Sequence, residues 1–349
     1  MTSIVIAGYL RSPFQFARKG GLINLRPDDL AAQVLRGLVE KLDLDPALLE
    51  DVIMGCAYPE GEQGTNVARI ASFRAGFPET LGGVTVNRFC GSSMTAIHFT
   101  AGQLLLGAGE AYIAAGVESM TRVPMGGFTP SPNPTLLQQF PEVYMAMGHT
   151  AEEVARRFDV SREDQDALAV LSHSKAACIR PGTNMEALAG LKPAFGGVVT
   201  AGTSSPLTDG SAAVLVCTED FALRHNLPML ARIKVTAVGG CAPEIMGMGP
   251  VEATRKVLAR GGLTINDVDL MEINEAFSSH VHEIASLLSE LFKVLPRSHL
   301  ILNGANTHRP NRPAEPAFSS RDIVQVPPFQ ERRVTAALQI SRQVVWDQT

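Results

Sequence analysis

The stretch Val86-Asn87-Arg88-Phe89-Cys90-Gly91-Ser92-Ser93-Met94 decides how this chain folds, because it places a thiol at the junction of two elements. Residues 82–89 form an apolar run with the β-formers Val84 and Val86, which predicts a buried strand. A helical pattern begins directly afterwards, so we expect Cys90 at a strand-to-helix turn. The unsatisfied amides at a helix start carry partial positive charge and favour a thiolate.

Two interpretations of Cys90 follow from this local pattern. The small residues Gly91, Ser92 and Ser93 would let a substrate approach the sulfur, as a nucleophile requires. Unpaired cysteine is also among the most buried residue types, so a core cysteine is the alternative. The stretch alone leaves both open.

Composition and charge narrow the class of protein. The 349 residues suffice for two or three domains, and 45% hydrophobic residues with 31 glycines are ordinary for an α/β enzyme. The formal net charge is −5, the isoelectric point is near 5.9, and no long basic run occurs. We therefore expect no binding to nucleic acid.

The cysteines and the apolar runs indicate a compartment. The 5 cysteines are scattered without C-x-x-C spacing, which fits a reducing compartment and argues against a disulfide framework or a bound metal. The N-terminus moves straight into a strand pattern without the features of a signal peptide. No apolar run reaches the length of a membrane span. We expect a cytoplasmic enzyme that does not enter a membrane.

Strand and helix patterns alternate over the first part of the chain. Residues 4–9, 51–55 and 111–116 read as strands. A helix opens at Pro27-Asp28-Asp29, with Pro near its start and acidic residues in its first turn. Its buried face is expected to comprise Leu30, Val34, Leu35, Leu38, Val39 and Leu42. The helix after Cys90 is expected to face inward through Met94, Ile97, Ala101, Leu104 and Leu105.

The alternation then stops and later returns. A stretch from about Thr121 to Gly202 is expected to be an inserted loop domain, with helices near Thr150 and after the capping-type start at Ser161. Beyond it, a helix over 251–260 and the segment 267–271 mimic the earlier helix and the strand at 51–55, at a separation of 218 positions. The two stretches read either as one unit used twice or as a chance likeness of amphipathic units.

Short motifs in a fixed order make the chain similar to the thiolase family, the acetyl-CoA acyltransferases. The likeness runs from residue 1 to about 304. Its motifs are 87–92 (NRFCGS), 115–121 (AGVESMT), 147–152 (MGHTAE), 200–205 (TAGTSS), 208–213 (TDGSAA), 249–251 (GPV) and 274–277 (NEAF). Each is weak alone, but together they place Cys90 at the family's nucleophile position.

The resemblance implies the thiolase fold, an α/β fold with two similar βαβαβαββ halves in five layers and a loop domain inserted in the first half. On this basis residues 1–120 and 203–228 form the N-terminal half, 121–202 the loop domain and 229–304 a partial C-terminal half. Residues 305–349 form a tail that does not match the family.

The resemblance also implies the chemistry. Cys90 attacks a 3-ketoacyl-CoA, acetyl-CoA leaves, and a second CoA takes the acyl group from the cysteine. Coenzyme A is then a co-substrate rather than a permanently bound cofactor, and acyl-CoA and CoA are the small-molecule partners. The family suggests a homodimer or a homotetramer.

Further site residues carry over by their motif positions. Asn274 corresponds to the family's holder of a water in an oxyanion hole, with a turn or cap residue as the alternative. Met147 and Gly148 resemble the segment that lines the acyl pocket, with core packing as the alternative. Ser204 and Ser205 resemble residues that bind the pantetheine arm of CoA. His149 is expected at the surface or a pocket rim, and Glu118 and Asp209 as structural turn and cap groups.

Two family motifs are missing from the C-terminal part: a Gly-His-Pro loop that supplies a base, and a Cys-x-Gly loop that supplies an acid and base. All 31 glycines lie at or before Gly304, and no Cys or Lys follows it. We expect this tail to be translated out of frame or otherwise unrelated to the family. His308 is the one candidate for the missing histidine, but it stands in Thr307-His308-Arg309-Pro310.

Three functions therefore stay open. The first is a thiolase-type acyltransferase that uses Cys90, impaired by the missing motifs. The second is a catalytically dead thiolase-like protein that at most binds CoA esters or a partner. The third is a condensing enzyme of the ketoacyl-synthase type, which shares the fold and the cysteine nucleophile.

Overall fold

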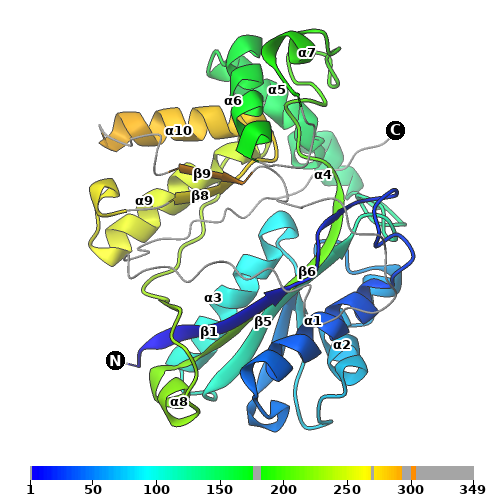
Figure 1. The fold of residues 1–349 in the computed structure, drawn as a ribbon. Coiled ribbons are helices and arrows are strands. Elements are labelled where there is room, and N and C mark those ends of the chain that lie inside the picture. Colours follow the sequence, from blue (N-terminus) through cyan, green and yellow to red (C-terminus); the bar gives the residue numbers. More distant parts are fainter. Residues whose placement is uncertain (1, 176–181, 269–270, 293–299, 304–349) are drawn as a thin grey trace. The chain divides into compact units, whose positions relative to one another are not determined.

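The computed structural model describes residues 2–175, 182–268, 271–292 and 300–303 (Figure 1). The chain forms two compact units. The described part of the first unit is 2–128 with Leu207–Thr236, and that of the second lies within Thr129–Pro206 and 237–303. The domain boundaries and the five-layer stacking expected from sequence stay predictions.

One mixed sheet forms the centre of the first unit. Its strands are β1 (Ile4–Arg11), β2 (Gln15–Phe16), β3 (Asp51–Gly55), β4 (Val84–Val86), β5 (Ala111–Ser119), β6 (Thr208–Thr218) and β7 (Ala231–Arg232). Their order is β4-β3-β5-β6-β1-β7, and β2 pairs with β6. Strand β3 runs parallel to β4 and β5, whereas every pair that involves β6 or β1 is antiparallel.

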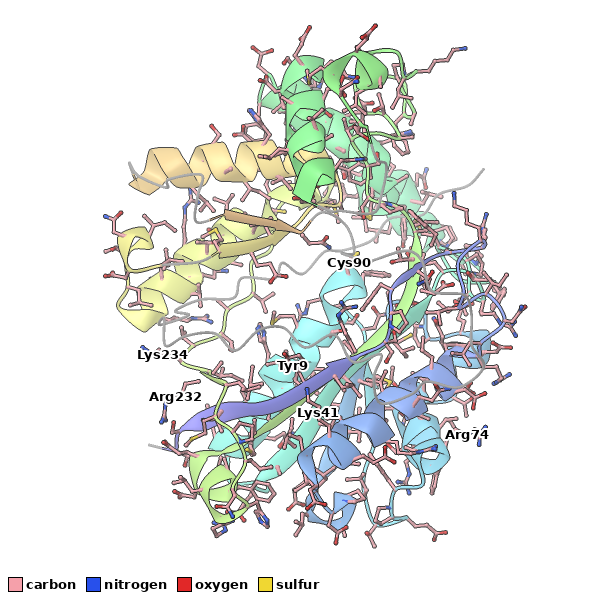
Figure 2. The ribbon with its side chains drawn as sticks, viewed as in Figure 1. Tyr9, Lys41, Arg74, Cys90, Arg232 and Lys234 are labelled. Atoms are coloured by element: carbon pink, nitrogen blue, oxygen red, sulfur yellow. The ribbon has the colours of Figure 1, made fainter. Side chains whose placement is uncertain are left out.

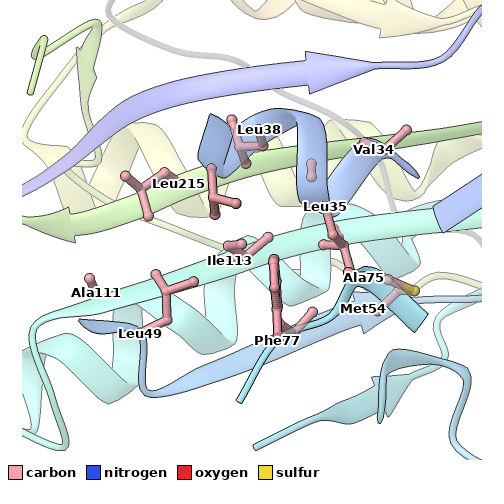
Figure 3. Close-up of a cluster of buried hydrophobic side chains, with 14 of the residues drawn as sticks. Val34, Leu35, Leu38, Leu49, Met54, Ala75, Phe77, Ala111, Ile113 and Leu215 are labelled. Carbon is pink, nitrogen blue, oxygen red and sulfur yellow. The ribbon is translucent and has the colours of Figure 1, made fainter. Parts of the chain in front are cut away.

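Helices cover both faces of this sheet. They are α1 (Pro27–Leu42), α2 (Val67–Ala75), α3 (Ser92–Leu105) and the short α8 (Glu219–Arg224). Side chains of a strand alternate between faces. In β3, Val52 and Met54 join the apolar cluster with α1 and α2, whereas Ile53 joins the cluster with α3. Figure 3 shows the first cluster, with Leu35, Leu38 and Ile113 among its members.

Helix α1 forms as its sequence predicts. Pro27 occupies the first turn, Asp28 and Asp29 follow it, and Asp43 ends the helix in the left-handed conformation at φ 49°. Its predicted apolar face is buried at Leu30, Val34, Leu35, Leu38 and Val39, and Leu42 is partly buried against the same cluster.

Two expectations around the cysteine are wrong in detail. Only Val84–Val86 of the apolar run forms a strand, and Val84 is 40% exposed. The reason is that β4 stands at the edge of the sheet, and among the described strands it pairs with β3 alone. In α3, Leu105, its last residue, is 62% exposed, whereas Ala101 and Leu104 are buried as expected and Ile97 packs against the same cluster. The buried residues of α3 are Ser92, Thr95, Ala96, Thr100, Ala101 and Leu104.

The second unit is mainly helical. Its helices are α4 (Pro134–Gln139), α5 (Met147–Arg157), α6 (Arg162–Lys175), α7 (Met185–Ala189), α9 (Gly249–Gly261) and α10 (Ser278–Phe292). Strands β8 (Met271–Asn274) and β9 (Leu300–Asn303) pair in parallel. An apolar core joins α5, α9, β8 and α10 through residues such as Val154, Leu258, Ile273 and Ile284. The predicted capping start of α6 is confirmed, because the Ser161 hydroxyl accepts from the Asp164 amide at 3.1 Å and the Asp164 carboxylate accepts from the Ser161 amide at 3.3 Å.

The expected repeat has a local counterpart in the structure. In the first unit α1 leads through a 3₁₀ turn, Pro46–Leu48, into β3. In the second unit α9 leads through a 3₁₀ turn, Ile265–Asp267, into β8. Both turns are capped by the side chain that precedes them, Asp45 and Thr264. The same order of helix, turn and strand therefore occurs in both places.

Helix α3 begins directly against the sheet. A Cβ atom built on Gly55 at the end of β3 would overlap the main chain of Ser92 and Ser93. A Cβ on Gly116 of β5 would overlap the side chain of Ser93. Only glycine permits this close approach of helix and strands, and the approach sets where the turn that carries Cys90 lies.

We predict that Gly55→Ala lowers the free energy of unfolding by about 1–3 kcal/mol, because main-chain atoms must move to admit the new methyl group. The matched control is Gly102→Ala in α3, where a Cβ meets nothing within 4 Å. It should raise the stability by about 0.5–1 kcal/mol through helix propensity. Urea unfolding followed by circular dichroism measures both, and equal effects of the two substitutions would contradict the close-approach argument.

Candidate active site

Cys90 lies in a 3₁₀ turn, Phe89–Gly91, which runs directly into α3. Its side chain is exposed, and Figure 2 shows it at the first turn of the helix. The alternative of a buried core cysteine is therefore wrong for Cys90, and that description fits Cys56 and Cys217 instead. An exposed sulfur beside a helix N-terminus can reach a substrate and gains stabilisation as a thiolate.

Hydrogen bonds from Ser92 close the turn around the cysteine. The Ser92 hydroxyl donates to the Phe89 carbonyl over 2.6 Å and accepts from the Arg88 amide over 2.8 Å. Phe89 has φ of 48°, which is uncommon for a residue with a side chain. These contacts hold the residues on both sides of Cys90 in one conformation.

Glu118, near the end of β5, organises the neighbouring loop. Its carboxylate accepts hydrogen bonds from the Ala57 amide at 2.7 Å and from Gln63 Nε2 at 2.8 Å, and the Cys56 sulfur lies 3.9 Å away. Gln63 is fully buried, and its Oε1 accepts from the Ser119 amide. Burial raises the pKa of Glu118 above its usual range, and these hydrogen bonds oppose that shift. This arrangement supports the structural role expected for Glu118.

Asp209 has a comparable place in β6. It is fully buried and accepts from the Thr121 amide at 2.9 Å and from the Thr121 and Ser119 hydroxyls. These contacts join β6 to the turn that follows β5. The geometry supports the expected structural role here too.

Tyr58 lies beside the turn that carries Cys90, and the sequence interpretation missed it. Its ring packs against Phe89, with 6.1 Å between the ring centroids. Burial raises the pKa of the Tyr58 hydroxyl, and the charges of Cys90 and Glu118 add to that shift. A signal did exist: Tyr58 follows the carboxyl end of β3, and sites in parallel sheets form at that edge.

The second unit brings together three of the predicted segments. Asn274 ends β8. Ala276 and Phe277, which follow it closely, contact Ser204 and Ser205, called the serine segment below. The Ser205 amide donates to the Ala276 carbonyl at 2.9 Å, and Ser204 forms an antiparallel bridge with Phe277. The Ser204 hydroxyl donates to the Thr200 carbonyl at 2.7 Å. Ser204, Ser205 and the Asn274 segment are therefore neighbours within this unit.

An aromatic cluster joins Met147 and Gly148 to the same place. Met147, at the start of α5, is partly buried against a core that contains Phe277. A Cβ on Gly148 would overlap the Phe195 ring, which packs edge-on against Phe277 at 6.0 Å between centroids. His149 is exposed, as expected, and touches the edge of Phe195.

Glu275 is a second feature that sequence reasoning did not single out. It follows Asn274 directly, is buried, and accepts a hydrogen bond from the Ser172 hydroxyl of α6. Its carboxylate thus ties the end of β8 to α6. The available signal was its place beside Asn274 in the motif at 274–277.

Three further expectations concern the C-terminal tail, membrane spans and metal sites. His308 and the tail after 304 lie outside the described residues. Across the residues that the structure does describe, no helix is both long and apolar enough to cross a membrane. The same residues contain no group of three or more His, Cys, Asp or Glu placed to hold a metal ion.

We predict that Glu118→Gln lowers the free energy of unfolding by about 1–3 kcal/mol. Each oxygen of the Glu118 carboxyl group accepts a hydrogen bond, from the Ala57 amide or from Gln63 Nε2, and the side-chain amide nitrogen of glutamine cannot accept one. A raised pKa means that the proton stabilises the folded wild type, and this contribution is lost as pH rises above 4.5. The difference in free energy of unfolding between wild type and Glu118→Gln should therefore become smaller as pH rises above 4.5.

The control is Glu153→Gln, at a surface carboxylate whose pKa Arg156 and Arg157 lower to about 2. Its contribution, about 0–1 kcal/mol, should be lost as pH falls from 4.5 towards 2. Urea unfolding at a series of pH values measures the difference in free energy of unfolding between wild type and each variant. With rising pH this difference should decrease for Glu118→Gln and increase for Glu153→Gln. A difference for Glu118→Gln that stays constant above pH 4.5 would refute the account of Glu118.

Comparison with known proteins adds sequence and structural relatives. Residues 4–178 and 177–220 match the thiolase N-terminal domain, and residues 227–294 match the thiolase C-terminal domain. The chain is 40% identical over 325 residues to a 3-ketoacyl-CoA thiolase of Bacillus subtilis, covering 81% of this chain and 83% of that protein. It is 43% identical over 314 residues to one of Shewanella denitrificans, covering 80% and 81%.

Among solved structures, the crystal structure of the Bacillus anthracis acetyl-CoA acetyltransferase is similar, with a TM-score of 0.77, 32% identity and 88% coverage of each chain. The expected thiolase-type α/β fold is confirmed by this likeness. The two domain matches cover more than half of the sequence. The chain therefore belongs to the thiolase family.

Proposed function

We propose that this protein is an acyltransferase of the thiolase type. It cleaves a 3-ketoacyl-CoA into acetyl-CoA and a shortened acyl-CoA, or runs the reverse condensation, through an acyl-cysteine at Cys90. The observation that carries the proposal is the exposed sulfur at the first turn of α3. The 40–43% identity to relatives named 3-ketoacyl-CoA thiolase supports the same reaction.

The reaction proceeds in two half-reactions. The Cys90 thiolate attacks the keto carbon, the carbon–carbon bond breaks, and acetyl-CoA leaves after its α-carbon takes a proton. The sulfur of a second CoA, having given up its proton, then attacks the acyl-cysteine and restores the thiolate. Covalent catalysis divides one difficult carbon–carbon step into two easier ones.

The other site residues take the roles that their motif positions suggest. Asn274 holds a water that stabilises developing negative charge on a thioester oxygen. Ser204 and Ser205 bind the pantetheine arm, and Met147 and Gly148 line the acyl pocket. In support, the serine segment, the Asn274 segment and the cluster with Met147 are joined by hydrogen bonds and packing within one unit.

The proposal extends to partners and location. Coenzyme A is the co-substrate, and no permanently bound cofactor is needed for this chemistry. The protein assembles as a homodimer or homotetramer in the cytoplasm. The scattered cysteines without C-x-x-C spacing support a reducing compartment.

We further propose that turnover is severely reduced. Residues 305–349 contain neither a Gly-His-Pro nor a Cys-x-Gly motif, and both supply proton-transfer groups in the family. Each such group contributes about 10²–10⁴-fold to a rate, and groups that act together are not additive. This observation also favours the second candidate, a thiolase-like protein that binds CoA esters without completing the reaction.

Incubation with acetyl-CoA should add one acetyl group to Cys90, detected by intact mass and located by peptide mapping. Cys90→Ala should abolish the adduct. The matched control is Cys241→Ala, which removes another exposed cysteine and should leave the adduct unchanged.

Acetoacetyl-CoA and CoA are then supplied to measure thiolysis. An adduct with thiolysis reduced by at least about 10²-fold relative to an intact thiolase is the expected result. Full turnover would disprove the impairment but support the thiolase reaction. The absence of any adduct would leave the non-catalytic candidate as the better description.

A further inference from the structure

We propose that Asn87 is a positioning residue that fixes the direction of the Cys90 sulfur. This inference rests on the proposed role of Cys90 as the nucleophile. Asn87 is not expected to touch the substrate or the reacting atoms. It acts through the main chain on either side of the cysteine.

Both polar ends of the Asn87 side chain are engaged. Its Nδ2 donates to the Ala57 carbonyl at 2.9 Å, and its Oδ1 accepts from the Phe89 amide at 2.8 Å. The carboxamide therefore bridges the loop after β3 to the residue directly before the nucleophile. Asn87 itself is exposed, so these bonds, rather than core packing, are its contribution.

The held residue, Phe89, needs such support. A left-handed conformation at φ 48° is sterically unfavourable for a residue with a side chain. Such strain persists where surrounding contacts over-determine the conformation. The Phe89 amide is held by Asn87, its carbonyl by Ser92, and its ring by Tyr58. Releasing the amide lets the turn relax and redirects the next side chain, which is Cys90.

Ala57, at the other end of the bridge, is connected by hydrogen bonds through Glu118 to the buried Gln63. The Ala57 amide donates to Glu118 at 2.7 Å, and the preceding amide, of Cys56, donates to the Val86 carbonyl at 3.1 Å. Glu118 is in turn held by the fully buried Gln63. A continuous set of hydrogen bonds thus leads from the interior through Ala57 and Asn87 to the turn of the nucleophile.

A structural and a positioning role predict different results. The hydrogen bond to the Phe89 amide is exposed and the one to the Ala57 carbonyl is partly buried. Their loss from an exposed side chain should cost less stability than the loss of a core contact, because water can replace at least the exposed partner. A change in the orientation of the Cys90 side chain slows the reactions of its sulfur, since a small misplacement of a reacting group costs up to about 10²-fold in rate. The sulfur would also leave the field of the α3 N-terminus, which favours the thiolate.

The experiment compares Asn87→Ala with wild type by two reactions at Cys90, each located by peptide mapping. The first is alkylation by iodoacetamide across a pH series, and the second is acetylation by acetyl-CoA. Asn87→Ala should move the midpoint of the alkylation profile to higher pH and slow acetylation by at least about tenfold. The melting temperature should stay close to that of wild type.

Two further variants make the result specific. Asn87→Asp keeps an acceptor for the Phe89 amide and should recover part of the acetylation rate. Asn184→Ala removes a carboxamide that accepts from the Ala187 amide at 2.8 Å at the start of α7, and it should change neither reaction.

A folded Asn87→Ala protein with an unchanged alkylation profile and acetylation rate would overturn the proposal. If Asn87→Ala does not fold, the Asn87→Asp variant decides, because it keeps the acceptor for the Phe89 amide but loses the donor to the Ala57 carbonyl. A folded Asn87→Asp protein with acetylation slower than wild type supports the bridge, and wild-type rates in both reactions overturn it. Failure of wild type to accept an acetyl group refutes the proposed function instead, and the alkylation profile then still decides the role of Asn87.

Discussion

The close contact between the first turn of α3 and the strands beneath it is the constraint on which the candidate site depends. Gly55 and Gly116 leave no room for a side chain there, so the helix start rests on the main chain of β3 and β5. Parallel strands carry their functional groups at their carboxyl ends. The contact therefore fixes an exposed thiol at the edge of the sheet where a substrate can meet it.

Buried or partly buried carboxylates hold the loops around this edge. Glu118 accepts from the Ala57 amide and Asp209 from the Thr121 amide, each with a further side-chain donor. Glu152 does the same in the second unit, where it accepts from the amides of residues 197–199. A carboxylate can satisfy several main-chain donors at once, which makes it an efficient organiser of irregular chain. These acids therefore serve the shape of the site rather than proton transfer.

The sequence predicted what local pattern controls. The buried face of α1 and the strand-to-helix position of Cys90 follow from periodicity and small residues, and the structure confirms both. The expected burial of Val84 and of Leu105 was wrong, because exposure at the edge of a sheet and at the end of a helix is set by tertiary packing. The rest of the expected face of α3 is confirmed at Ala101 and Leu104. Asn87 stands in the same motif as Cys90, but its hydrogen bond to Ala57 depends on how the chain folds, as does the packing of Tyr58 against Phe89. Spacing along the sequence does not give these contacts.

The candidate site residues belong to two different units, and this separates the groups that hold Cys90 from the other candidate residues. Cys90 and the groups that hold its turn, from Ser92 to Glu118, all belong to the first unit. Asn274 and the serine segment belong to the second, and the missing family motifs would follow them in sequence. Formation of an acyl-cysteine needs first of all a directed, ionised sulfur, whereas its release also needs groups that move protons. The contacts that hold the turn of Cys90 all come from residues before the absent motifs, so under the proposed function the first half-reaction is the one expected to persist without the complete cycle.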